Sequence, residues 1–306
     1  MKIIVILGPT ATGKSDLAVQ IATKVGGEVI SADSRQVYTG LNIGTGKITK
    51  REMRDIPHHL LDIISPKKVF SVAEWQKMTK KKIVEIIARG HVPIIVGGTG
   101  FYIQSIVDDI VLPEVPPNKV LRKKLEKKSA AELFEMLRSM DPRRARGMIA
   151  ENSDKNPVRL IRAIEIATKL GRVPELAGHQ VSGKSEYKFL QIGLTTDPEI
   201  LKKRIHTRLL KRMKQGMVSE ARKLHTNGLS YKRMRALGLE YRHLADFLEN
   251  NLTKDELIGK LDQEIYQYAK RQITWFKRDA RIQWFNVGSP AQSRAICGKV
   301  LKLYSE

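Results

Sequence analysis

The chemistry that this sequence can perform is clearest at residues 8–15, which read GPTATGKS. A glycine, four intervening residues and then Gly-Lys-Ser is the spacing of a loop whose backbone amides bind phosphate. Gly8 and Gly13 let N–H groups turn toward an anion, Lys14 reaches the phosphate charge, and the hydroxyl of Ser15 suits Mg²⁺. The spacing therefore predicts a site for a phosphorylated ligand without saying which ligand it is.

The flanking residues support this interpretation. The apolar run KIIVIL (2–7) predicts a buried strand, and DLAVQIATKVGG (16–27) has the apolar spacing of a helix. A glycine-rich turn without a ligand is the alternative. Strand, loop and helix in this order are the context that the motif requires, so they favour phosphate binding.

A carboxylate follows the second predicted strand. The stretch GEVISADSRQVY (27–38) places Asp33, Ser34 and Gln36 where that strand ends. Asp33 could bind Mg²⁺, act as a general base or cap a helix, since Asp-Ser is a good helix start. Its position in the sequence does not decide between these roles.

Two glycine-rich stretches complete the candidate site. GGTGFYIQ (97–104) follows an apolar strand, and its Thr99 offers a hydroxyl, although a tight strand-to-helix turn is the alternative. LNIGTGKI (41–48) is polar and rich in glycine, which predicts a mobile loop.

Alternating strands and helices predict an α/β fold with a P-loop-like parallel sheet. The expected strands are residues 3–7, 27–32, 58–64, 92–98 and 188–194, and a helix is expected over 71–90. Prolines in VLPEVPPNK (111–119) indicate a boundary. We expect a core of residues 1–113 and 186–306, a helical insertion of residues 114–185, and helices from Asp197 nearly to the end.

Charge points to a polyanionic partner. The 306 residues include 55 Lys+Arg and 32 Asp+Glu, a net charge of +23. Residues 201–243 hold 13 Lys/Arg against two Asp/Glu, and the insertion has basic runs at 122–128 and 143–146. A solvated basic surface is the plain alternative, but nucleic acid explains so large an excess better.

Other classes are disfavoured. The single Cys297 excludes a disulfide framework and a cysteine-based zinc site. No apolar run approaches 18 residues and no signal-peptide pattern opens the chain, so a cytoplasmic protein without membrane contact is expected.

Seven stretches in order resemble one known family, the bacterial tRNA dimethylallyltransferases. They are GPTATGKS, SADSRQVY, LNIGTGK, PHHLLDI, VGGTGFYI, NPVRLIRAIEI and AKRQITWFKR, and the resemblance extends from Lys2 to about Trp284. It implies that the loop holds the pyrophosphate of dimethylallyl diphosphate rather than ATP, with Mg²⁺. The dimethylallyl group would pass to the exocyclic amine of the adenosine 3′ of the anticodon.

The resemblance also implies roles for residues. Asp33 resembles the general base, and Thr10, Lys14 and Arg208 the other catalytic residues. The residues expected to bind the diphosphate are Gly8, Pro9, Thr10, Ala11, Thr12, Gly13, Lys14 and Ser15, with Ser15 also as the metal ligand. Those expected to contact the tRNA anticodon arm are Asp33, Ser34, Arg35, Gln36, Thr99, Arg122, Val158, Arg159, Leu160, Ile161 and Arg162. A monomer is expected.

Some interpretations stay open. RALGLEYR (235–242) departs from the family pattern at Leu239, so no role is assigned there. Some of Lys270, Arg271, Gln272 and Trp275 are expected to supply further tRNA contacts, although Trp275 and Phe276 could equally belong to the core. A P-loop kinase using ATP and a non-catalytic RNA-binding protein are the rival functions.

Overall fold

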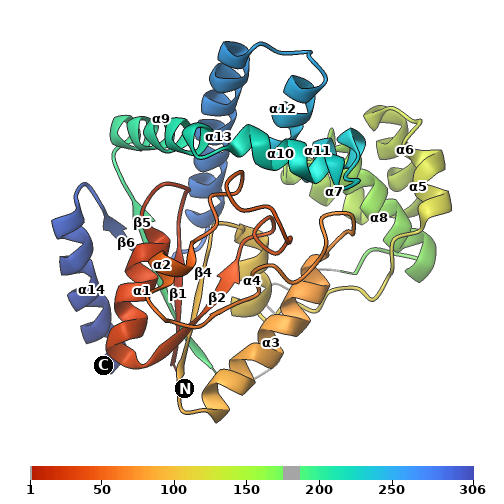
Figure 1. Cartoon of the computed structure of the whole chain (residues 1–306). Coiled ribbons are helices and arrows are strands. Elements are labelled where there is room, and N and C mark those ends of the chain that lie inside the picture. Colours follow the sequence, from red (N-terminus) through yellow and green to blue (C-terminus); the bar gives the residue numbers. More distant parts are fainter. Residues whose placement is uncertain (1, 175–186) are drawn as a thin grey trace. The chain divides into compact units, whose positions relative to one another are not determined.

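The computed structural model describes residues 2–174 and 187–306, and over these residues it contains one parallel sheet (Figure 1). The strand order is β3-β2-β4-β1-β5-β6. The strands are β1 (Lys2–Leu7), β2 (Gly27–Ala32), β3 (His58–His59), β4 (Val92–Gly97), β5 (Lys188–Thr195) and β6 (Gln283–Asn286). The predicted α/β class with a P-loop-like parallel sheet is confirmed.

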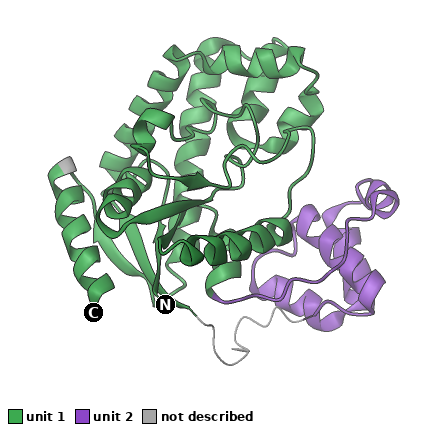
Figure 2. Cartoon of the chain, turned by 60° about the horizontal axis from the view of Figure 1, so that its bottom comes forward, with its two compact units in different colours: residues 1–107, 182–306 green, residues 108–181 purple. Residues whose placement is uncertain are grey.

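The chain divides into two compact units (Figure 2). Unit 1 comprises residues 1–107 and 182–306, and unit 2 comprises residues 108–181. The first division thus falls six residues before the expected boundary at 113/114, while the expected boundary at 185/186 lies outside the described residues.

Helices cover the sheet of unit 1. They are α1 (Lys14–Val25), α2 (Lys50–Met53), α3 (Val72–Ala88), α4 (Gly100–Val107), α9 (Pro198–Lys214), α10 (Met217–Thr226), α11 (Tyr231–Leu237), α12 (Leu239–Leu248), α13 (Lys254–Phe276) and α14 (Pro290–Ser305). Successive side chains of a strand point to opposite faces. Ile3 and Val5 accordingly pack with α3, α4, α9 and α13, whereas Ile4 and Ile6 pack with α1 and α14. Both faces of β1 are therefore buried, which explains its continuous apolar run.

Unit 2 is helical throughout its described residues. It contains α5 (Lys119–Leu125), α6 (Ala130–Met140), α7 (Pro142–Ala150) and α8 (Pro157–Leu170). These helices enclose an apolar core of their own, in which Leu133, Leu137 and Leu160 are fully buried. The sequence predicts this region as a helical insertion.

Two strand predictions were wrong. Residues 58–64 form a strand only at His58 and His59, because Leu60 (φ 61°) and Asp62 (φ 53°) adopt left-handed conformations that end the extended backbone. Conversely, β6 lies in a region expected to be helical. It is a four-residue edge strand with no fully buried side chain, so its sequence lacks the apolar pattern of a central strand.

The register of three central strands determines where the loops emerge. Leu7 of β1 and Ala32 of β2 are both paired with Gly97 of β4. The next residues of the three strands, Gly8, Asp33 and Gly98, therefore leave the sheet at the same edge. In parallel sheets the carboxyl ends of the strands are where ligands bind, especially where the strand order changes direction.

An ionic cluster lies toward the other end of the sheet. The buried carboxylate of Glu28 on β2 accepts hydrogen bonds from Arg89 (3.1 and 2.7 Å), and its oxygens lie 2.5 Å from His59 Nε2 and 2.6 Å from His91 Nδ1. Burial opposes ionisation, but hydrogen bonds with Arg89 and the two histidines outweigh it and lower the pKa of Glu28 to about 2. One carboxylate thus links β2, β3 and the connection from α3 to β4.

We expect Glu28→Gln to lower the free energy of unfolding at pH 7 by about 1.5–3 kcal/mol, because the neutral amide loses the charge-assisted hydrogen bonds with Arg89 and the two histidines. The stabilisation by Glu28 is present above the pKa of the unfolded state, 4.5, and is lost as pH falls toward the folded-state value of about 2. Urea unfolding measured from pH 7 to pH 3 should therefore show the wild type and the variant converging.

Glu85→Gln is the matched control. Its carboxylate pairs with Lys82 on the surface of α3, so this variant should unfold close to the wild type. A Glu28→Gln variant as stable as the control would contradict the role of the cluster.

Candidate active site

The loop between β1 and α1 has the backbone of an anion-binding loop. Gly8 (φ 136°), Ala11 (φ 63°) and Gly13 (φ 84°) have positive φ values, which turn successive amides toward one side. No side chain caps α1, whose N-cap residue is Gly13. The first amides of α1 are thus left for an anion, which the helix dipole also favours.

Lys14 lies across this loop. Its Nζ donates to the carbonyl of Pro9 at 2.6 Å, and the Thr12 hydroxyl donates to the same carbonyl at 2.9 Å. Burial, and next the charge of Arg208, lower the pKa of Lys14 to about 7, against the opposing effect of Asp33. A negatively charged ligand would stabilise the ammonium form, so the site is electrostatically suited to an anion.

Arg208 of α9 contacts the phosphate loop. Its Nη1 donates to Thr10 Oγ1 at 3.4 Å and its Nη2 to the carbonyl of Gly46 at 2.9 Å. Burial, and next the charge of Arg212, lower the pKa of Arg208. The structure therefore brings together Thr10, Lys14 and Arg208, as the sequence predicts for a diphosphate site.

Gln272 of α13 holds the loop from another side. Its Oε1 accepts from the amide of Thr10 at 2.9 Å, and its Nε2 donates to the carbonyl of Gly98 at 2.9 Å. Gln272 is only 6% exposed, although its sequence context suggests a contact with tRNA. A Cβ at Gly98 would overlap Gln272 Nε2. The glycine at position 98 is therefore the sequence feature that could have indicated this close contact.

Asp33 caps a turn rather than a helix. Its Oδ1 accepts from the amides of Arg35 (2.8 Å) and Gln36 (3.2 Å), while Oδ2 receives no hydrogen bond from the described residues. Capping and chemistry are therefore compatible, because each uses a different oxygen. The free oxygen can accept a proton from a ligand.

Thr99 joins Asp33 at this edge. Its Oγ1 accepts from the amide of Ser34 at 3.0 Å, and its own amide donates to the carbonyl of Ala32 at 3.2 Å. The Tyr268 side chain is hydrogen-bonded to Thr99, and burial, followed by the charge of Asp33, raises the pKa of Tyr268. The turn of 97–100 is thus a strand-to-helix connection that also places a hydroxyl beside the carboxylate.

Trp275 is half-buried, in an edge contact with Phe101, and a Cβ at Gly100 would overlap its ring. Phe276 is 3% exposed and belongs to the core. Lys270 and Arg271 are exposed on the same helix. Of Trp275 and Phe276, only Trp275 has enough exposed surface to contact a ligand.

The remaining predicted tRNA contacts lie in unit 2. Arg122 forms two hydrogen bonds with the buried Glu165 (2.8 and 2.7 Å), and Arg162 Nη1 lies 3.5 Å from the same carboxylate. Leu160 and Ile161 are 0% and 8% exposed in the core of this unit. The members of this group that are open to solvent are Val158 and Arg159.

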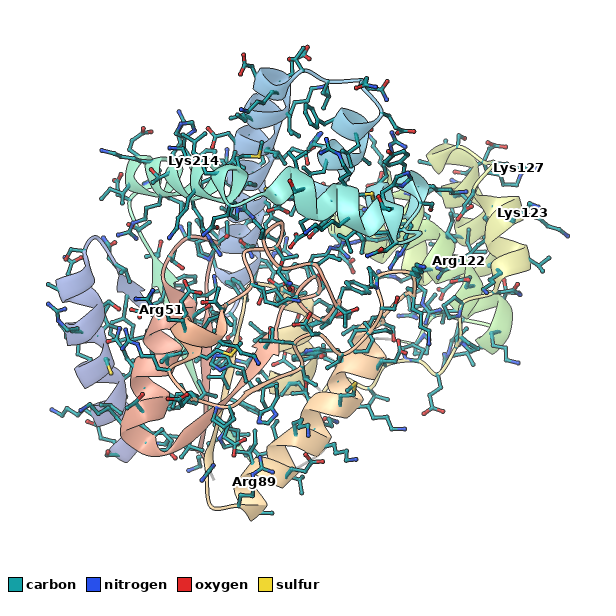
Figure 3. The ribbon with its side chains drawn as sticks, viewed as in Figure 1. Arg51, Arg89, Arg122, Lys123, Lys127 and Lys214 are labelled. Atoms are coloured by element: carbon teal, nitrogen blue, oxygen red, sulfur yellow. The ribbon has the colours of Figure 1, made fainter. Side chains whose placement is uncertain are left out.

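Exposed cations are present in both units (Figure 3). Lys123 and Lys127, on α5 and just after it, project outward in unit 2, and Arg51 of α2 and Lys214 of α9 are exposed in unit 1. Such side chains bind phosphates without reading sequence. They account for part of the net charge of +23.

The residues present fit a Mg²⁺ ion. The Ser15 hydroxyl is exposed in the first turn of α1, and Asp33 Oδ2 is free on the neighbouring loop. A hydroxyl, a carboxylate and the oxygens of a bound phosphate form the ligand set that Mg²⁺ favours. No cluster of three or more His, Cys, Asp and Glu suited to a metal occurs among the described residues.

Comparison with known proteins gives consistent matches. The sequence model of the family described as IPP transferase matches residues 36–279. The chain is 41% identical over 288 residues to the tRNA dimethylallyltransferase of Anoxybacillus flavithermus, covering 94% of this chain and 90% of that protein. It is 40% identical to the enzyme of the same name from Carboxydothermus hydrogenoformans, covering 94% and 92%.

Solved structures agree with these matches. The tRNA isopentenylpyrophosphate transferase of Bacillus halodurans has a TM-score of 0.71 and 36% identity, covering 98% of this chain and 96% of that one. A eukaryotic dimethylallyltransferase, described as acting on tRNA, has a TM-score of 0.79 and 26% identity, covering 95% and 75%. Both comparisons span the two units. Among the described helices, none combines the length and apolar character needed to cross a bilayer.

The lowered pKa of Lys14 predicts that diphosphate binding takes up a proton. At pH 8 a lysine with a pKa of about 7 is roughly nine-tenths neutral, and a bound polyanion restores its charge. Calorimetry with inorganic diphosphate, in buffers of different ionisation enthalpy, should show about 0.9 more protons taken up by the wild type than by Lys14→Arg, which stays charged. Equal proton uptake in the two proteins would show that Lys14 does not meet the anion.

Proposed function

The chain belongs to the IPP transferase family and is a tRNA dimethylallyltransferase, and we propose that its phosphate loop holds the diphosphate of dimethylallyl diphosphate. The observation that supports this most is the set of cations around the loop. The charge of Arg208 lowers the pKa of Lys14, and the carboxylate of Asp33 lies on the adjacent turn. Such a site can hold a leaving diphosphate next to a proton acceptor.

The loop would stabilise the leaving group. Transfer breaks the C–O bond between the allyl carbon and the diphosphate, so negative charge grows on the diphosphate oxygens. Backbone amides at the start of α1, together with Lys14 and Arg208, are donors already directed to the place where this charge develops. One such donor is worth about 3 kcal/mol of the barrier. Mg²⁺ held by Ser15 would add positive charge at the same oxygens.

Asp33 would accept the proton. The exocyclic amine of adenosine is a weak nucleophile, because its lone pair is delocalised into the ring. As its nitrogen bonds to the allyl carbon, one N–H proton must leave, and the free Oδ2 of Asp33 can take it. The products are the prenylated adenosine, diphosphate and the protonated carboxyl group. The turn hydrogen bonds to Oδ1 keep the carboxylate oriented throughout.

The tRNA would present the adenosine in an extruded state. A base whose exocyclic group reacts must leave its stack, at a cost of a few kcal/mol, and anticodon loops allow this more readily than duplexes. Phosphate contacts from exposed lysines and arginines can offset that cost. We propose Arg35, Gln36 and Thr99 in unit 1, and Val158 and Arg159 in unit 2, as contacts with the anticodon arm. We also propose that the enzyme works as a monomer in the cytoplasm.

The choice of donor tests this function directly. With tRNA and Mg²⁺, the protein should transfer a labelled group from dimethylallyl diphosphate to tRNA and should neither hydrolyse ATP nor transfer phosphate from it. Mass spectrometry of digested tRNA identifies the product. Phosphate transfer from ATP, with the isoprenoid ignored, would instead support a P-loop kinase.

Asp33→Asn removes the proton acceptor but keeps the turn, because the amide oxygen can still accept hydrogen bonds from the backbone amides of Arg35 and Gln36. Loss of a general base typically costs 10²–10⁴ in rate, so we expect kcat to fall at least about a hundredfold. Filter binding should show tRNA affinity close to that of the wild type. Asp255→Asn, an exposed change at the start of α13, serves as the control and should leave both unchanged. Undiminished transfer by Asp33→Asn would remove Asp33 from the mechanism.

A further inference from the structure

Glu220 of α10 is a carboxylate that none of the predicted roles includes. Its Oε2 accepts from the amides of Asn42 (3.0 Å) and Ile43 (2.7 Å), and its Oε1 accepts from the amide of Gly44 (2.9 Å). The hydroxyl of Tyr241 donates to Oε1 as well, at 2.7 Å. Hydrogen bonds to an ionised acceptor are roughly twice as strong as neutral ones. Three amides of the 41–48 loop therefore hold it against the Glu220 carboxylate, and the Tyr241 hydroxyl is a fourth donor from α12.

The carbonyls of the same loop contact cations. Gly44 accepts from Arg212 Nη1 at 2.8 Å, and Gly46 accepts from Arg208 Nη2 at 2.9 Å. Arg212 also pairs with Glu240 at 3.0 Å. An anion thus binds the loop's amides, while two cations from the preceding helix, α9, bind its carbonyls.

The two glycines are required by this arrangement. A Cβ at Gly44 would meet the Tyr241 hydroxyl at 2.6 Å, and one at Gly46 would overlap Arg208 Nη2. The loop that its sequence predicts to be mobile is therefore packed closely against its charged partners. Thr45 adds a hydrogen bond from its hydroxyl to the carbonyl of Leu41 at 2.7 Å.

Arg208 depends on this loop for its direction. One of its terminal nitrogens is held by the carbonyl of Gly46, and the other contacts Thr10 in the phosphate loop. If the 41–48 loop moved, Gly46 would no longer hold Arg208 in place. Glu220 lies on the next helix, does not contact the phosphate loop through any described hydrogen bond, and acts only through this loop.

We propose that Glu220 is a positioning residue for group transfer: it fixes the 41–48 loop so that Gly46 holds Arg208 against the diphosphate site. This inference rests on the proposed function. Glu220 is half-buried and borders a surface cavity of about 530 Å³ that Asn42 and Lys223 also line, so water can reach the carboxylate if its contacts are weakened.

Glu220→Gln is the primary test, because the amide keeps the size of the side chain but replaces one acceptor oxygen by a donor. Displacing a catalytic group by about 1 Å costs on the order of a hundredfold in rate. We therefore expect kcat for dimethylallyl transfer to fall about a hundredfold, while KM for tRNA changes less than about threefold. A folded Glu220→Gln protein with wild-type kcat would overturn the proposal.

A double-mutant cycle with Arg208→Lys tests the route. If Glu220 acts through Arg208, the double variant should be no slower than Arg208→Lys alone, since neighbours in one network are not additive. Losses that multiply would show that Glu220 acts independently, which contradicts the proposal. Tyr241→Phe removes one donor from the same carboxylate and should give a smaller loss of kcat. If Glu220→Gln does not fold, the double-mutant cycle with Arg208→Lys can be measured with Tyr241→Phe instead.

Glu256→Gln is the control. Glu256 belongs to the exposed capping box of α13 with Thr253, outside the loop network, and the change should leave kcat unchanged. Calorimetry with inorganic diphosphate gives a readout that needs no prenyl transfer: Glu220→Gln should bind it at least about tenfold more weakly than the wild type. A wild type that binds diphosphate but transfers no prenyl group would refute the proposed function alone, whereas equal diphosphate binding by both proteins would refute the role of Glu220.

Discussion

The parallel pairing of β2, β4 and β1 is the constraint on which the site depends. Leu7, Gly97 and Ala32 are aligned in register, so three loops begin at the same edge of the sheet. The phosphate loop, the turn at Asp33 and the turn at Thr99 are neighbours for this reason alone. A shift of one strand by a residue would separate Asp33 from the glycine-rich loop of residues 8–15, whatever the loop sequences were.

Helices from the second half of the chain supply side chains to the site that lies at the edge of the sheet. Arg208 on α9 and Gln272 on α13 both contact Thr10, one at its hydroxyl and one at its amide. The phosphate loop is therefore held from the carboxyl-terminal half of the chain as well as from β1. Residues separated by about two hundred positions in sequence thus meet at this loop, where burial, and next the charge of Arg208, lower the pKa of Lys14.

Several features were accessible from the sequence because they are local. The glycine spacing around Lys14, the apolar strand before it and the carboxylate after β2 each follow from a short stretch of residues. The same holds for the helical insertion, whose proline-rich start marks a change of composition. The sequence failed where the signal is weak or nonlocal: β6 is short and half-exposed, and Leu60 ends β3 by a left-handed backbone that no residue type requires.

By itself the sequence determined the α/β class, the phosphate loop, the basic character and the family, since these depend on periodicity, spacing and ordered motifs. Only the tertiary structure decided which polar groups have hydrogen-bond or ion-pair partners within the protein and which remain available to a ligand. Arg122 is paired with Glu165, Gln272 is buried as a link, and Glu220 holds a loop, although all three are ordinary polar residues in the sequence. The reason is physical: hydrogen bonds and ion pairs depend on distances between chain segments, and those distances exist only once the core has packed.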